Sequence, residues 1–163
     1  MKDFLVIANI NAITYNDLFP LLKDGIVNLG YEKPKEYESP DGVIEKSGSY
    51  WYTTLKVIHK SLPLVKTYTP EKYPKYDNYP AIEVGRVKDI PTDYTEEMGV
   101  PITIFDYMLD GFVILGIAAD KYGNEEWMIK GSPIYRYRHP PFVGMELNGK
   151  HKYARVLIRR KQL

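Results

Sequence analysis

The sequence predicts a mixed α/β fold, with strands and a helix in the first third and a loop-rich, mostly β region after it. One observation is the continuous apolar run at residues 4–8, which is typical of a strand buried on both faces of a parallel sheet. Another is the apolar stripe at helical spacing over residues 18–22. Finally, prolines at positions 63, 70, 74, 80, 91 and 101 exclude long helices and uninterrupted central strands there.

The first two expected elements are a strand over residues 4–10 and a helix over residues 14–23. Thr14 is a suitable N-cap, and Asp17 stands three residues later, as in an acidic variant of the capping box. Pro20 should keep this helix short or kink it, because proline has no amide hydrogen to donate.

Two more strands complete the α/β part. Residues 26–31 return from the helix, which gives the strand, helix, strand order of α/β proteins. Residues 32–48 hold prolines, Asp-Gly and Ser-Gly, and are expected to be a polar connection with turns. Residues 50–55 are aromatic and β-branched, which favours a strand.

The proline-rich region and the C-terminus should contain only short elements. Strands are expected at residues 81–84 and 112–118, and one or two helical turns at residues 104–109. Asn-Gly within residues 147–150 predicts a hairpin, because both residues suit the positive φ angles of a type I′ turn. In the last strand, residues 152–159, odd and even positions should face opposite sides.

The composition of the 163 residues, 44% hydrophobic and without cysteine, favours one ordinary domain and excludes disulfides and thiolate zinc sites. The lack of cysteine is consistent with a cytoplasmic location. No apolar run approaches the roughly 20 residues needed to cross a bilayer, and the first residues are not typical of a signal peptide. We therefore expect no membrane association.

Charge is distributed unevenly along the chain. Residues 1–120 hold 12 Lys/Arg and 18 Asp/Glu, whereas residues 121–163 hold 10 Lys/Arg and 3 Asp/Glu. A basic C-terminal block could neutralise nucleic-acid phosphates, and the alternative is a solvated strand face.

Several chemistries have no support in the sequence. The three histidines lack the spacing of metal ligands, so no metal site is expected. The chain also lacks a nucleophile elbow and the glycine-rich nucleotide-binding motifs.

Several segments in colinear order carry a family resemblance: residues 9–15, 50–53, 75–79, 81–84, 98–103 and 153–160. Together they resemble the C-terminal half of EcoRI-type adenine-specific DNA methyltransferases. The resemblance implies that residues 1–56 are the trailing part of a Rossmann-like methyltransferase sheet and that residues 57–163 are a target-recognition region. The alternative is that both parts form one compact unit. The family's S-adenosylmethionine loop and its Asn-Pro-Pro-Phe catalytic loop belong to the other half. We therefore expect no catalytic residue and no cofactor bound by this chain alone, although the complete enzyme would use S-adenosylmethionine.

The resemblance also implies substrate-binding residues. Asn9 and Asn11 stand at the carboxyl end of the first strand and would lie near the mouth of the active site, since ligands bind beyond the carboxyl ends of such strands. Turn and capping chemistry is their alternative role. Trp51 and Tyr52 would hold the flipped adenine, with a place in the core as the alternative.

For DNA itself, the sequence offers two groups of residues. Cations interleaved with aromatics favour base recognition by Arg136, Arg138 and His139. Phosphate contacts are expected from Lys150, Lys152, Arg155, Arg159, Arg160 and Lys161. His139 also begins a His-Pro-Pro-Phe run, which we interpret as a coincidental likeness to the family's catalytic loop.

The predicted partner is double-stranded DNA. Two further partners are considered: the N-terminal methyltransferase half on another chain, and a second copy of this chain in a homo-oligomer. The predicted function is DNA target recognition within an adenine-N6 methyltransferase of a restriction-modification system, and the isolated chain is expected to be inactive. Two alternatives remain open, a catalytically inert DNA-binding remnant and a protein-interaction domain. Binding to duplex DNA at low salt separates the last from the others.

Overall fold

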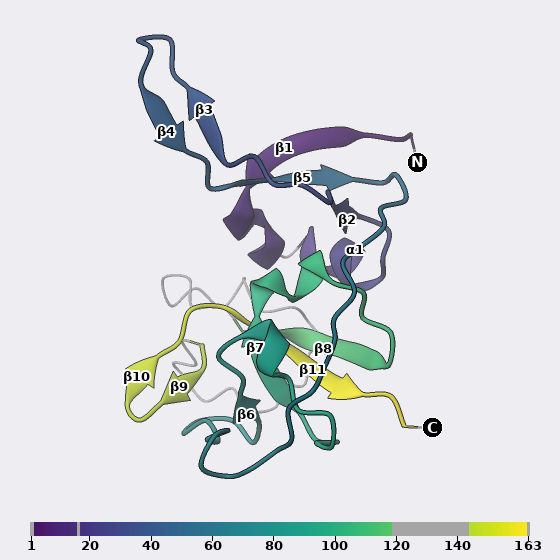
Figure 1. Cartoon of the computed structure of the whole chain (residues 1–163), viewed down its shortest axis with the longest axis vertical. Coiled ribbons are helices and arrows are strands. Elements are labelled where there is room, and N and C mark those ends of the chain that lie inside the picture. Colours follow the sequence, from purple (N-terminus) through teal and green to yellow (C-terminus); the bar gives the residue numbers. More distant parts are fainter. Residues whose placement is uncertain (1, 16, 119–143, 163) are drawn as a thin grey trace. The chain divides into compact units, whose positions relative to one another are not determined.

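The computed structural model describes residues 2–15, 17–118 and 144–162, and its regular structure is mostly strands with a few short helices. The chain divides into two compact units, Met1–Lys60 and Ser61–Leu163 (Figure 1). Arg136, Arg138 and His139 lie outside the described residues.

The first unit is built on a three-stranded sheet in the order β1 (Leu5–Asn9), β5 (Ser49–Thr53) and β2 (Asn28–Leu29). β5 is antiparallel to both neighbours, so β1 and β2 run in the same direction. The three strands were predicted, but the expectation that the first is buried on both faces is wrong. Leu5, Val6 and Ile7 are 56%, 47% and 53% exposed. A continuous apolar run predicts a strand but does not identify what covers it.

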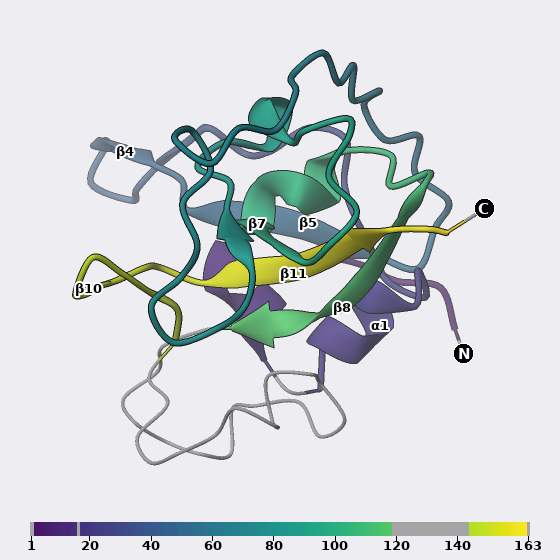
Figure 2. The same ribbon diagram turned by 90° about the horizontal axis from the view of Figure 1, so that it is seen from below.

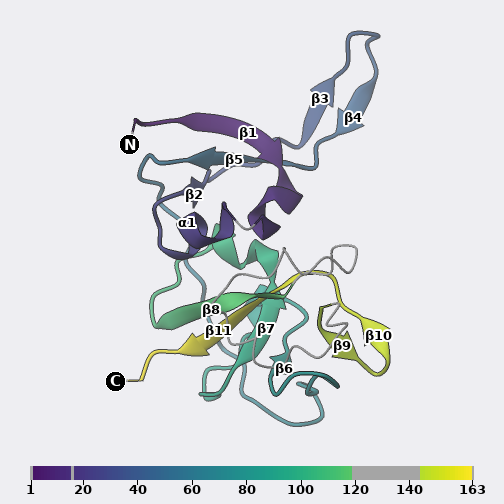
Figure 3. The ribbon, with the colours of Figure 1, turned by 180° about the vertical axis from the view of Figure 1, so that it is seen from behind.

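The predicted helix over residues 14–23 is replaced by two shorter helices. A 3₁₀ helix, η1 (Ile10–Thr14), follows β1 directly, and α1 (Phe19–Lys23) begins just before Pro20. Proline is tolerated in the first turn of a helix, where its missing amide hydrogen is not needed, so Pro20 starts the helix rather than kinking it. Figure 3 shows η1 and α1 on one side of the three strands, where their buried side chains form the core of this unit.

The expected polar connection of residues 32–48 contains a β-hairpin. β3 (Glu36–Glu38) pairs with β4 (Ile44–Lys46), and all six residues are exposed. Its turn depends on Gly42, whose φ of +80° disfavours a side chain. The turn residues predicted a polar connection here but not the strand pairing within it.

The second unit holds a four-stranded mixed sheet in the order β6 (Ile82–Glu83), β7 (Met98–Pro101), β11 (Arg155–Arg160) and β8 (Phe112–Ala118). β6 and β7 are parallel, and the other pairs are antiparallel. Figure 2 shows β11 between β7 and β8.

The short helices of the second unit are η2 (Val87–Asp89) and η3 (Ile102–Asp106). The predicted strands at residues 81–84 and 112–118 are confirmed. The helical turns expected at residues 104–109 form earlier, at residues 102–106, and the strand β7 was not predicted.

β11 departs from the alternation of faces expected for residues 152–159. Val156, Leu157 and Ile158 are all buried, and the pairing with β8 shifts between Leu157 and Ile158. Leu115 is the extra residue of β8 at this β-bulge. β11 is therefore a central strand covered on both faces rather than a half-exposed charged strand.

The predicted hairpin at residues 147–150 is confirmed. β9 (Glu146–Leu147) pairs with β10 (Lys150–His151), and Leu147 lies opposite Lys150. Asn148 and Gly149 have φ angles of +52° and +69°, as a type I′ turn requires.

A buried polar cluster joins β6, β11 and the loop before β6. The Arg155 guanidinium donates from Nη2 to Glu83 Oε1 at 2.8 Å and from Nε to Glu83 Oε2 at 3.0 Å. The Tyr76 hydroxyl donates a short hydrogen bond to the same carboxylate. Gly99 permits this approach, because a Cβ there would overlap the Tyr76 ring. The cluster fixes the position of the loop relative to the sheet.

Glu83 should make the stability of the second unit pH-dependent. Burial alone would raise the pKa of its carboxyl, but the hydrogen bonds from Arg155 and Tyr76 and the nearby positive charges outweigh burial and lower the pKa. A lowered pKa adds stability above the carboxyl's unfolded pKa, about 4.3, and that stability is lost as pH falls through the folded pKa.

We therefore predict that Glu83→Gln lowers the free energy of unfolding at neutral pH by roughly 3–5 kcal/mol, because it leaves the Arg155 charge buried without a counter-charge. The difference between the variant and the unsubstituted protein should shrink below about pH 4. Urea unfolding at a series of pH values measures both. A difference that stays constant down to acid pH would contradict the role assigned to the carboxylate.

Candidate functional site

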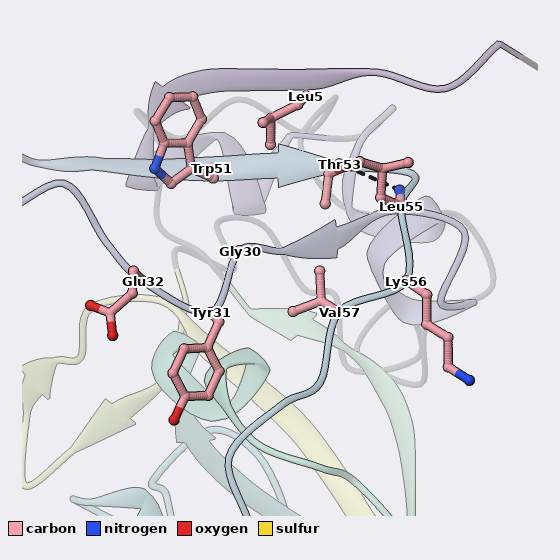
Figure 4. Close-up of a pocket in the computed structure, with 9 residues that line it drawn as sticks. All are labelled: Leu5, Gly30, Tyr31, Glu32, Trp51, Thr53, Leu55, Lys56 and Val57. Atoms are coloured by element: carbon pink, nitrogen blue, oxygen red, sulfur yellow. Dashed lines mark hydrogen bonds between the residues drawn. The ribbon is translucent and has the colours of Figure 1, made fainter.

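The first unit contains an open, mostly apolar pocket of about 280 Å³ (Figure 4). It lies on β1, β5 and the segments that follow β2 and β5. Its lining residues are Leu5, Gly30, Tyr31, Glu32, Trp51, Thr53, Leu55, Lys56 and Val57.

Trp51 lines this pocket, whereas Tyr50 and Tyr52 point to the opposite face of β5, because side chains alternate along a strand. The indole is partly exposed. Gly30 lets it pack closely against the end of β2, since a Cβ at Gly30 would come within 2.7 Å of Trp51 Cβ. The structure therefore presents Trp51 on the sheet face opposite the core.

Tyr52 takes no part in the pocket. Its side chain is 2% exposed, and its hydroxyl donates to the backbone oxygen of Asn9 at 3.0 Å. Burial raises the pKa of the Tyr52 hydroxyl, so it stays protonated as a donor. This geometry supports the core role for Tyr52.

Asn9 is the last residue of β1, and Asn11 lies in η1, which follows β1 directly. The Asn9 side chain accepts a hydrogen bond from the Asn11 amide at 2.8 Å and thereby caps η1. Thr14 Oγ1 donates to the Asn11 carbonyl at 2.8 Å. This is the capping role considered as an alternative, and it leaves substrate binding by either residue a prediction. Asn9 shares its sheet face with Trp51, because Asn9 pairs with Ser49 and Ile7 with Trp51.

The pocket does not fit S-adenosylmethionine, whose amino acid and ribose groups need several directed polar partners. Thr53 is buried, and its hydroxyl is already bonded to the Phe4 carbonyl at 2.7 Å and to the Leu55 amide at 3.0 Å. Glu32 and Lys56 are exposed side chains. The lining residues therefore offer no enclosed set of polar partners for this cofactor.

The six residues expected to contact phosphate differ in how free their charges are. Lys150 and Lys161 are exposed, and they lie before and after β11 in the chain. Arg159 is partly buried. Lys152 lies 3.9 Å from the Glu83 carboxylate.

The other two arginines have structural contacts. Arg155 has a side chain only 12% exposed and is committed to Glu83. Arg160 donates to the Pro91 carbonyl at 3.0 Å, and its guanidinium lies 4.9 Å from the centre of the Phe112 ring. Within residues 144–162, the charges most available to a phosphate are therefore those of Lys150 and Lys161.

The residues that hold the β9–β10 hairpin by hydrogen bonds were not predicted from the sequence. Asp77 and Asn78, in the loop that also carries Tyr76, form hydrogen bonds with residues 144–149. Residues 75–79 contributed only to the family resemblance. A usable signal was the acidic Glu83 inside an apolar strand, because a buried acid requires a cationic partner and indicates a polar cluster nearby.

Among the described residues, no group of three or more His, Asp and Glu side chains could hold a metal ion. No helix in those parts of the chain is both long enough and apolar enough to cross a membrane.

Comparison with known proteins identifies relatives along the whole chain. Type II methyltransferase M.EcoRI of Escherichia coli is 34% identical over 185 residues, which cover 99% of this chain and 51% of the relative. Type II methyltransferase M.MpnI of Mycoplasma pneumoniae is 28% identical and covers 99% of this chain and 57% of the relative. The chain thus spans about half the length of the curated relatives it matches.

No solved structure matches the chain. The family described as "Adenine-specific methyltransferase EcoRI" matches residues 1–161. The resemblance inferred from short segments is confirmed by this match, and the chain belongs to the EcoRI-type adenine-specific DNA methyltransferase family.

Proposed function

We propose that the chain contributes DNA target recognition, and part of the pocket for a flipped adenine, to a site-specific adenine-N6 DNA methyltransferase of a restriction-modification system. The observation that carries this proposal is the family match over residues 1–161, which covers nearly all of this chain but only about half of its relatives. The described residues include an aromatic pocket and exposed C-terminal lysines.

The three-stranded sheet supports a place within a larger methyltransferase sheet. β1 and β2 run in one direction with β5 reversed between them, and only β5 pairs with β1 among the described strands. An apolar strand with an unpaired edge readily accepts another strand. In our proposal β1 is covered by the preceding half of the enzyme, on the same or another polypeptide, and the sheet is the trailing part of a Rossmann-like one.

Self-association of this 163-residue chain tests the assignment of β1 as an edge that another strand covers. Ile7→Lys should reduce concentration-dependent dimers or larger species, because a charge on β1 opposes edge pairing. Sedimentation velocity measures the change. Ile44→Lys is the matched control, since Ile44 is 60% exposed but lies on β4. Equal loss of association in both variants, or in neither, contradicts a specific role for the β1 edge.

Trp51 is the proposed base-stacking residue. Enzymes that act on a base extrude it from the stack and hold it against aromatic or apolar groups. Trp51 offers a partly exposed ring in an apolar pocket, on the sheet face that also carries Asn9 at the carboxyl end of β1. Tyr52 is not included, because its ring is buried.

We predict that Trp51→Ala weakens binding to a duplex with an unpaired adenine by about 1–3 kcal/mol, the usual effect of losing base stacking. Binding to the fully paired duplex should change much less. Trp51→Phe keeps an aromatic ring and is expected to retain most of the preference. Fluorescence anisotropy with both duplexes provides the comparison. Lost folding stability with an unchanged preference would favour a core role for Trp51.

Phosphate binding by the C-terminal lysines can be tested separately. Lys161→Ala should reduce the slope of log affinity against log salt by about 1 on a random-sequence duplex, because one fewer counterion is released. Lys46→Ala, a change in the exposed β4 strand, serves as the control and should leave the slope unchanged. Affinity that does not depend on salt, or duplex binding that is absent at low salt, contradicts DNA recognition by this chain.

A further inference from the structure

The β9–β10 hairpin, residues 144–151, is attached to the second unit at its base and exposed at its tip. Met145 is fully buried and belongs to a core cluster with Tyr76, Tyr79 and Leu157, and Leu147 packs against that cluster. Asn148, Gly149 and Lys150 are exposed. The type I′ turn holds these three residues in one backbone conformation.

Two polar side chains of the loop before β6 hold this hairpin from the side. Asn78 donates from Nδ2 to the Gly144 carbonyl at 2.8 Å and accepts from the Glu146 amide at Oδ1 at 2.9 Å. Asp77 Oδ2 accepts from the Gly149 amide at 2.8 Å, and the Asp77 amide donates to the Glu146 carbonyl at 2.8 Å. Four hydrogen bonds thus run from two consecutive residues to the base and the turn of the hairpin.

The position of Asp77 is informative because of its charge. An exposed carboxylate bonded to the turn that carries Lys150 would repel a phosphate approaching that lysine. The carboxylate is nevertheless useful there if its hydrogen bond to the Gly149 amide holds the turn in place. The affinity gained by holding the turn must then exceed the affinity lost to repulsion. The Glu146 carboxylate lies 3.5 Å from His151 Nδ1, so the acidic residue on the hairpin itself has a partner within it.

We infer that the β9–β10 hairpin is a DNA-contacting element and that Asp77 and Asn78 are its positioning residues. This inference rests on the proposed function and deepens it by naming the element that meets the duplex. A two-stranded β-ribbon fits the major groove of B-form DNA. The exposed tip brings Lys150 to the phosphates and Asn148 to the groove. A hairpin held in its bound conformation loses less conformational freedom on binding than a mobile loop.

The comparison of Asp77→Ala with Asp77→Asn isolates the positioning role. Both substitutions remove the negative charge, but asparagine keeps an oxygen that can accept from the Gly149 amide. Affinity for a random-sequence duplex of about 30 base pairs, measured by anisotropy at low salt, is the readout. Asp77→Asn should bind at least as tightly as the unsubstituted chain, and Asp77→Ala about threefold to tenfold more weakly than Asp77→Asn, the range expected from one hydrogen bond. Equal affinities for the two variants overturn the positioning role.

Amide hydrogen exchange supplies a second measurement on the same variants. Asp77→Ala should lose protection at the Gly149 amide while the strands of the four-stranded sheet keep theirs, and Asp77→Asn should keep both. Loss of protection throughout the second unit of Asp77→Ala would overturn a role limited to the hairpin.

Lys150→Ala tests the DNA contact at an exposed residue where misfolding is not expected. It should lower the salt slope by about 1, and the effect of Asp77→Ala should be smaller in its background, because residues acting through one element are coupled. Additive effects overturn the inference. If the unsubstituted chain binds no duplex, the proposed function fails as well. If it binds but Lys150→Ala changes nothing, only the hairpin assignment fails.

Discussion

The buried ion pair between Glu83 and Arg155 is the constraint on which the second unit depends. It joins β6 to β11, two strands separated in the sheet by β7, and it fixes Tyr76 in the loop before β6. A buried pair is stable only when its remaining donors and acceptors are satisfied, and here Arg155 also donates to the carbonyls of Tyr153 and Ala154. Asp77 and Asn78 follow Tyr76 directly, so the cluster also fixes the position of the two residues whose hydrogen bonds hold the β9–β10 hairpin. A core interaction thereby determines the geometry of an exposed tip.

In the first unit, unlike the second, one face of the main sheet is only partly covered by other elements. One face of its three-stranded sheet packs against η1 and α1, while the other carries Trp51 and its pocket, and the apolar side chains of β1 are about half exposed. A small sheet gains most of its stability from buried apolar area, and in our proposal the exposed β1 residues are covered by the preceding half of the enzyme. This is consistent with the family relationship, since the relatives matched along 99% of this chain are about twice its length.

Local patterns in the sequence predicted β1, β2, β5, β6, β8, β11 and the Asn-Gly hairpin, because strand composition and turn conformation depend on nearby residues. They did not predict β3, β4 or β7, which lie in segments rich in turn residues, glycine or proline. Long-range features were less accessible. The apolar run at residues 4–8 predicted burial on both faces, but an apolar pattern does not show which part of the fold covers a strand. Pro20 predicted a short or kinked helix over residues 14–23, whereas it lies in the first turn of α1. Arg155 looked like a phosphate ligand, since a charge pattern does not reveal a buried partner 72 residues earlier in the chain. Trp51 and Tyr52 could be separated only after the strand pairing fixed which face each residue occupies.

In our proposal, this chain holds duplex DNA through its C-terminal region. Photo-crosslinking of the full chain to a random-sequence duplex carrying a photoreactive thymine analogue, followed by mass spectrometry of the crosslinked peptides, tests it most directly. We expect crosslinks in the β9–β10 hairpin and in the basic segments near it in sequence, and few on the exposed β3–β4 hairpin. Crosslinks confined to the first unit, or the absence of crosslinks at low salt, would contradict it.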